Sequence, residues 1–299
     1  MAGPQNATPF DVMEFPPRLR RGRRWWMRLK RDRTFVFAVT GLGLMVAVVV
    51  GGPWLSPYGE SEQLLENTYA PPGAAHWFGT DVLGRDLLTR MMYGGRISLI
   101  VGLAGAAISL SIGVLVGGVA GLAGGWTERL LMRFIDFLYG VPLLLVVIAL
   151  MVITGPGLTN IFLALGLVYW LQMARMVRAR VVELRTRDFI AAARVLGAGW
   201  NRILLVHLIP NAMGVIAVTT TFMIPQAIFA ESFLSFLGLG VTLPHASWGT
   251  LAAEGLTAMA VHPHVLAFPA VAICLTIFLF QTLGEAMRAA LDPHRKGLD

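Results

Sequence analysis

Residues 97–123 read ISLIVGLAGAAISLSIGVLVGGVAGLA, a stretch without a charged side chain. A helix needs about 20 apolar residues to cross the roughly 30 Å hydrocarbon layer of a bilayer, so this stretch is long enough. Small residues recur at every fourth position and form a slowly winding stripe, which lets another helix backbone come close. That helix could belong to this chain or to a second membrane subunit. The stripe consists of Gly105, Ser109, Gly113, Gly117, Gly121 and Gly125.

Five further apolar runs lie around this one. Residues of the set AVILMFWYC make up 56% of the 299-residue chain, and charged residues make up only 14%. An average soluble domain has about 25% charged residues, so too few polar groups are present here to cover a soluble surface. The sequence therefore predicts an all-α membrane protein with six transmembrane helices. The other five runs cover about residues 35–55, 134–153, 158–176, 212–239 and 265–286.

The motifs of common enzymes and metal sites are absent from the sequence. The single cysteine, Cys274, excludes an internal disulfide framework and a cysteine-based zinc site. A P-loop needs Gly directly before Lys, but the only two lysines, Lys30 and Lys296, follow Leu and Arg. His262 and His264 alone are too few ligands for a metal site. We therefore expect no enzyme activity, no metal and no cofactor bound by this chain.

Basic residues predict the orientation of the chain. It has 24 Lys and Arg against 17 Asp and Glu, a net charge of +7. Most of the basic residues lie before the first run, between the fourth and fifth runs, and after the sixth. The opposite side carries only Arg85, Arg90 and Arg96. The positive-inside rule then places both termini in the cytoplasm, and such a charge excess indicates contact with anionic lipid rather than nucleic acid.

These observations predict five parts along the chain. The first apolar run is longer than the core of a secretory signal, so we expect it to be a retained anchor. The parts are a basic cytoplasmic tail (1–34), a first transmembrane anchor helix (35–55), an outer, periplasmic loop (56–96), a five-helix core (97–287) and a cytoplasmic tail (288–299).

The cytoplasmic loop 183–211 predicts two short helices. Its first part is rich in alanine and has one apolar side, and Gly197 and Gly199 interrupt the helix. A second amphipathic piece leads to Pro210, which suits the first turn of the next helix. Without further information, such a pair could simply lie on the bilayer surface.

The same loop resembles the EAA loop of ABC importer permeases, whose pattern is E-A-A, three residues, Gly, nine residues and I-x-L-P. Residues 191–193, Gly197 and residues 207–210 match this spacing. Ala191 replaces the acidic residue of the pattern, His207 replaces Ile, and Ile209 replaces Leu. The helix–glycine–helix arrangement is kept.

Other segments resemble the permeases of dipeptide, oligopeptide and nickel importers, with the C-type permeases of oligopeptide importers the nearest match. Each segment is short, but all stand in the family's order on a consistent six-helix topology. They are residues 78–81, 84–86, 93–99, 231–240, 247–249 and 290–293.

The resemblance implies the type I ABC importer permease fold and a subunit that moves oligopeptides or dipeptides across the inner membrane. It implies a heterodimer with a second permease, two ATPase subunits that bind ATP and Mg²⁺, and an extracytoplasmic substrate-binding protein. It also implies a coupling helix that docks on the ATPase through Phe189, Ile190, Ala191, Ala192, Ala193, Arg194, Leu196 and Gly197. The alternatives are a nickel or antimicrobial-peptide permease of the same family and a proton-coupled secondary transporter.

Several polar residues fall inside the apolar runs. A carboxylate such as Glu231 is costly in a membrane, so we expect it to face a pathway or to form a hydrogen bond between helices. Gln172, Gln226 and Gln281 place amides in the fourth, fifth and sixth runs, and Gln226 is the candidate pathway residue among them.

Three charged residues stand out in the outer loop. Asp81, Arg85 and Asp86 could contact the binding protein or could hold the loop together. Gly79 and Gly84 bracket them, which predicts a tight turn there.

Overall fold

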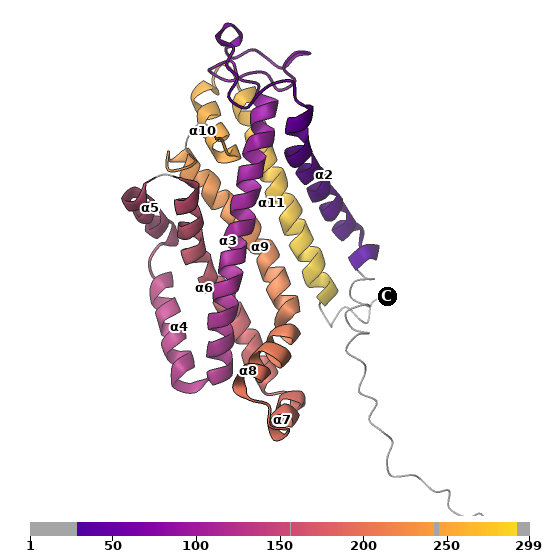
Figure 1. The fold of residues 1–299 in the computed structure, drawn as a ribbon, viewed down its shortest axis with the longest axis vertical. Helices are drawn as coiled ribbons and strands as arrows, with labels where there is room; N and C mark the ends of the chain where they lie inside the picture. The colour runs from indigo at the N-terminus through magenta and orange to yellow at the C-terminus, as the bar shows by residue number, and fades with distance from the viewer. Residues whose placement is uncertain (1–28, 156, 242–244, 292–299) are drawn as a thin grey trace, which may run out of the picture.

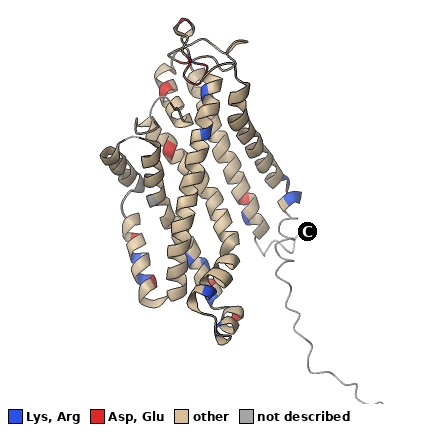
Figure 2. Cartoon of the chain, in the orientation of Figure 1, with Lys and Arg blue, Asp and Glu red and all other residues tan. Residues whose placement is uncertain are grey.

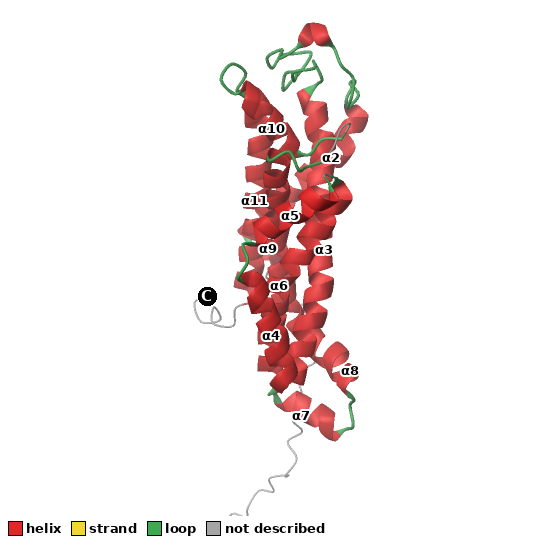
Figure 3. Cartoon of the chain, turned by 90° about the vertical axis from the view of Figure 1, so that its left-hand side faces the viewer, coloured by secondary structure: helices red, strands yellow, loops and turns green. Residues whose placement is uncertain are grey.

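The computed structural model describes residues 29–155, 157–241 and 245–291, and these form a long helical bundle (Figure 1). An outer loop with a short 3₁₀ turn, Leu65–Asn67, lies at one end, and two short helices lie at the other (Figure 3). The helices are α2 (Arg33–Leu55), α3 (Leu87–Ala123), α4 (Gly125–Tyr139), α5 (Leu143–Thr154), α6 (Leu158–Arg185), α7 (Asp188–Val195), α8 (Trp200–Arg202), a π-helical segment (Ile203–Leu208), α9 (Ile209–Phe236), α10 (Trp248–Ala258) and α11 (His264–Leu291).

Five helical spans in the described residues are long and apolar enough to cross a membrane. They are α2, α3, α6, the continuous run Trp200–Phe236, and α11. The third predicted span, 134–153, is not one straight helix, because α4 and α5 meet at 78° across a break of a few residues. Pro142 stands in that break and cannot supply the N–H that a continuous helix needs. The prediction of six spans is met when this bent pair counts as one.

Two other features of the helices differ from the sequence-based outline. Helix α3 begins at Leu87, so the last part of the predicted outer loop 56–96 is helical. Helix α10 lies outside the predicted spans, and it begins with a capping box in which the Ser247 hydroxyl accepts from the Thr250 N–H. Most of the predicted tails, residues 1–28 and 292–299, lie outside the described residues.

The small-residue stripe of α3 packs against α6. A Cβ atom added to Gly113 would lie 2.5 Å from the Cβ of Met173, and one added to Gly121 would lie 2.8 Å from the Cβ of Val181. A Cβ on Gly117 would collide with the carbonyl oxygen of Ala174. Here the stripe serves packing within the chain, the first of the two alternatives for these positions.

Arg96 of α3 binds two backbone carbonyls of α2. Pro53 lies inside α2, so the carbonyl of Val49 loses the N–H that would otherwise bind it four residues on. The guanidinium of Arg96 replaces that donor: Nε donates to the Val49 oxygen at 2.9 Å, and Nη2 donates to the Val50 oxygen at 2.5 Å. A carbonyl without a partner is costly in a membrane, so Arg96 both satisfies α2 and holds it in place.

Basic residues are concentrated at the end of the bundle that carries α7 and α8 (Figure 2). The outer loop and α10 lie at the opposite end (Figure 3). This separation along the bundle axis matches the predicted division of charge between the two sides of the membrane.

Replacement of Arg96 by Leu should destabilise the chain, because two carbonyls of α2 lose a charged donor. We expect a loss of about 2 kcal/mol in unfolding free energy, measured by thermal or denaturant unfolding in detergent. In a Pro53→Ala background the helix can supply an N–H to Val49 itself, so the same Arg96→Leu change should cost less. An equal cost in both backgrounds would disprove the pairing.

Candidate functional site

The first candidate surface is the exposed side of α7. Ile190 and Ala193 are buried and Phe189 packs against the core, so these three side chains hold α7 in place and have little surface left for docking. Val195 and Leu196 are 88% and 86% exposed, which leaves two large apolar side chains open at this end of the bundle. The motif pattern did not point to Val195. The exposed members of the predicted coupling set are Ala191, Ala192, Arg194, Leu196 and Gly197.

Gly197 ends α7 in a left-handed conformation, with φ at +79°. Its N–H donates to the Arg194 oxygen, and the N–H of Ala198 donates to the Ala193 oxygen, both at 2.9 Å. This pair of bonds is a Schellman motif, which satisfies the carbonyls at the end of the helix. No atom lies within 4 Å of a Cβ added to Gly197, so the glycine is there for its backbone conformation rather than for crowding within the chain.

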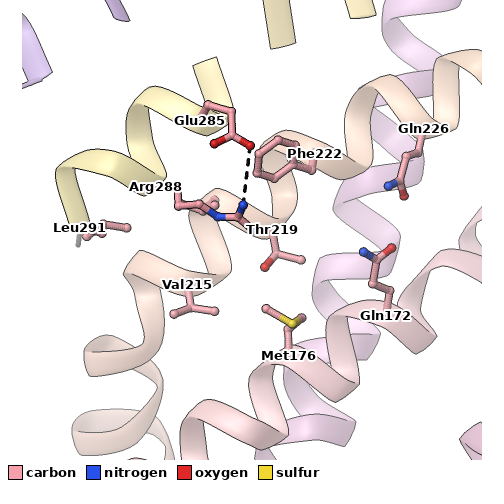
Figure 4. Close-up of a pocket in the computed structure, with 10 residues that line it drawn as sticks. Gln172, Met176, Val215, Thr219, Phe222, Gln226, Glu285, Arg288 and Leu291 are labelled. Atoms are coloured by element: carbon pink, nitrogen blue, oxygen red, sulfur yellow. Dashed lines mark ion pairs between the residues drawn. The ribbon is translucent and has the colours of Figure 1, made fainter. Parts of the chain in front are cut away.

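The second candidate site is a groove between α6, α9 and α11 that reaches the C-terminal end of α11. Its larger part has a volume of about 430 Å³, and a second part of about 360 Å³ shares Phe222 and Gln226 with it. Figure 4 shows side chains from all three helices around this space. The larger part is lined by Gln172, Met176, Val215, Val218, Thr219, Phe222, Gln226, Glu285, Arg288 and Leu291.

Glu231 lies outside this groove and is fully buried. Its carboxylate accepts from the Ser235 hydroxyl at 2.7 Å and from the Ser98 hydroxyl at 3.3 Å. The N–H of Trp248 in turn donates to the Ser98 oxygen at 3.1 Å. Of the two roles considered for Glu231, the contacts are those of a hydrogen bond between helices, since they join α3, α9 and α10.

The outer loop is held to the bundle by buried ion pairs. Asp81 accepts from Arg85 Nε at 2.7 Å and from Arg90 Nη1 at 2.5 Å. Arg90 is only 1% exposed and also donates to both carboxylate oxygens of Glu254 on α10. One arginine thus joins the loop, α3 and α10, because its planar group offers several donors at once.

The second acid of the loop has its own partners. Asp86 accepts from the N–H and the hydroxyl of Thr89, both at 2.8 Å, and lies 2.9 Å from His76 Nδ1. Gly79 and Gly84 have φ values of +79° and +72°, as a tight turn requires. Asp81, Arg85 and Asp86 are at most 5% exposed, so their geometry suits holding the loop together. A protein that docks on the loop would meet other side chains first.

The architecture is that of a known class of membrane protein. A solved chain of the MetNI methionine ABC transporter, in inward-facing conformations, matches the fold with a TM-score of 0.57. The match covers 69% of this chain and 97% of the other, at 19% sequence identity. The fold is therefore that of a type I ABC importer permease.

Sequence comparisons then identify the family. Residues 113–297 match the model of the binding-protein-dependent transport system inner membrane component, and residues 21–72 match the N-terminal transmembrane domain of oligopeptide transport permease C. The chain belongs to this family of permeases and is a multi-pass protein of the inner membrane.

Named relatives are similar over nearly the whole chain. The dipeptide transport system permease protein DppC of Bacillus subtilis is 48% identical over 269 residues, which is 90% of this chain and 84% of that protein. The oligopeptide transport system permease protein OppC of the same organism is 45% identical and covers 90% of this chain and 89% of its own. OppC of Escherichia coli is 39% identical, with 91% and 92% covered. Family membership excludes the secondary-transporter alternative.

Replacement of Arg90 by Met should be strongly destabilising, since it removes a buried cation from between two carboxylates. We expect a loss of about 3 kcal/mol in unfolding free energy, read from thermal unfolding of the detergent-solubilised chain. The outer loop should also become sensitive to protease.

The matched control is Arg187→Met. Arg187 pairs with Glu183 at 3.3 Å on the surface, so its loss should cost less than about 1 kcal/mol. Equal effects of the two changes would contradict the assignment of Arg90 as the joint between the loop, α3 and α10.

Proposed function

We propose that this chain is a permease subunit of an ATP-driven importer of oligopeptides or dipeptides. The observation that carries the proposal is its 48% and 45% identity, over nine-tenths of its length, to a dipeptide and an oligopeptide permease. The groove supports it, because a cavity of about 430 Å³ falls within the roughly 300–1,000 Å³ of small-ligand sites. In this proposal Gln226 faces the peptide pathway, and Glu231 positions the helices beside it.

The proposed machinery needs partners. A second permease would form a heterodimer with this chain, and an extracytoplasmic binding protein would deliver the peptide. Two ATPase subunits would bind ATP and Mg²⁺, because the sequence has no P-loop of its own. Membrane lipid surrounds the assembly, and no nucleic acid takes part.

The contact with the ATPase would form on the exposed side of α7. Two apolar side chains, Val195 and Leu196, stand almost fully open there beside Arg194. Open apolar side chains at the cytoplasmic end of a membrane protein favour burial in a partner. Motion of the ATPases would then reach the bundle as a rigid-body displacement of α7.

Replacement of Gly197 by Trp should uncouple transport, because a bulky side chain strains the left-handed end of α7 and would also stand between α7 and the ATPase. We expect peptide uptake to fall at least tenfold and the ATPases to co-purify poorly, while the chain still inserts in the membrane. Uptake in proteoliposomes and a mild-detergent pull-down with mass spectrometry measure the two effects.

The control for this change is Gly197→Asn, because asparagine tolerates positive φ without comparable bulk. Its uptake should stay within about twofold of the wild type. Wild-type uptake in the Trp variant would refute the docking surface. Failure of the unmodified complex to import any peptide would refute the proposed function.

The proposed orientation has both termini and α7 in the cytoplasm. In a Cys274→Ala background, a cysteine at the exposed position Thr186 should be shielded from an impermeant thiol reagent in intact cells. A cysteine at Ser61, in the outer loop, should react. The opposite labelling pattern would contradict this orientation and place α7 outside the cytoplasm.

A further inference from the structure

The groove between α6, α9 and α11 contains three side-chain amides, one from each helix. Gln172 and Gln226 line its larger part, and Gln226 and Gln281 line its smaller part. Figure 4 shows Gln172 and Gln226 directed from opposite walls into the same space. The amides therefore follow the length of the groove rather than gathering at one point.

None of the three side-chain amides has a hydrogen-bond partner within the described part of the chain; of Gln226 only the backbone oxygen accepts a bond, from the Tyr169 hydroxyl. An amide without a partner is costly in an apolar setting, by several kcal/mol in a membrane. Some polar side chains of the membrane helices do find partners within the chain, as Ser111 of α3 does with the Ala107 oxygen at 2.9 Å. The groove amides are thus open to a partner from outside the chain.

The chemistry of a carboxamide matches a peptide backbone. Each glutamine side chain offers two N–H donors and an accepting oxygen. It can therefore donate to a carbonyl of a peptide backbone and accept from a backbone N–H. Along α9, Thr219 and Gln226 lie seven residues apart, a rise of about 10 Å. An extended peptide covers that distance in about three residues, since it advances about 3.3 Å per residue.

The groove carries little net charge. Its only charged lining residues, Glu285 and Arg288, pair with each other at 3.6 Å. The guanidinium of Arg288 also lies 5.5 Å from the centre of the Phe222 ring. A site with a neutralised ion pair and neutral amides has no strong preference for the charge of a substrate side chain.

We propose that Gln172, Gln226 and Gln281 bind the backbone of the passing peptide and so make translocation largely independent of its side chains. This inference rests on the proposed import of peptides and adds the chemical basis of recognition. Gln226 and Gln281 are exposed and Gln172 is half-buried, so a transient ligand has access to them. A second permease would complete the wall opposite.

The test uses the complete importer in proteoliposomes with ATP and loaded binding protein. Gln172, Gln226 and Gln281 are each replaced by Met, which removes the amide and keeps the volume. The control is Ser111→Ala, which removes a polar group from an exposed position of α3 outside the groove. The substrates are trialanine, two tripeptides with a central Lys or Glu, and a trialanine with N-methylated peptide bonds.

Each Met variant should lower uptake about threefold to tenfold, as the loss of one hydrogen bond implies, and by the same factor for all three ordinary peptides. Ser111→Ala should match the wild type. The N-methylated peptide lacks backbone donors, so it should cross slowly in the wild type and lose little more in the variants.

Three results would overturn the inference while peptide import by the wild type stands. The first is unchanged uptake in all three Met variants. The second is a fall in uptake for only one of the three ordinary peptides. The third is loss of the second permease from the purified complex of a variant, which would assign the amides to the subunit interface. Absence of import by the wild-type complex would instead remove the proposed function, and this inference with it.

Discussion

The close approach of α3 and α6 is the constraint on which the bundle depends. Lipid tails are as apolar as the side chains they would replace, so helices in a membrane associate mainly through tight van der Waals contact. Gly113, Gly117 and Gly121 allow that contact, since a Cβ on any of them would meet atoms of α6. With α6 held against α3, its other side is free to line the groove through Gln172 and Met176.

Much of the fold could be predicted because its signals are local in sequence. An apolar run of sufficient length has few alternatives to a spanning helix, and the division of basic residues orients the whole set. The end of α7 at Gly197 was equally predictable, because a left-handed helix terminus favours glycine. The family pattern placed the coupling helix, although it could not tell buried Ile190 from exposed Leu196.

Features that depend on contacts between distant residues could not be predicted from the sequence. Arg90 and Glu254 are 164 positions apart, and no local pattern connects them. The groove is a similar case: Gln172, Gln226 and Gln281 were visible as polar residues, but only the packing of three helices shows that they share one space.

The path of the backbone between α6 and α9 has a mechanical consequence. Helix α6 ends at Arg185 just before α7, and the chain returns through α8 and the π-helical segment straight into α9. Two walls of the groove are therefore covalent extensions of the same exposed helix. The third wall, α11, has no such link to α7 and follows it only through side-chain packing. A displacement of α7 would therefore act directly on α6 and α9, and the π-helical segment lies on the covalent path from α7 to Gln226.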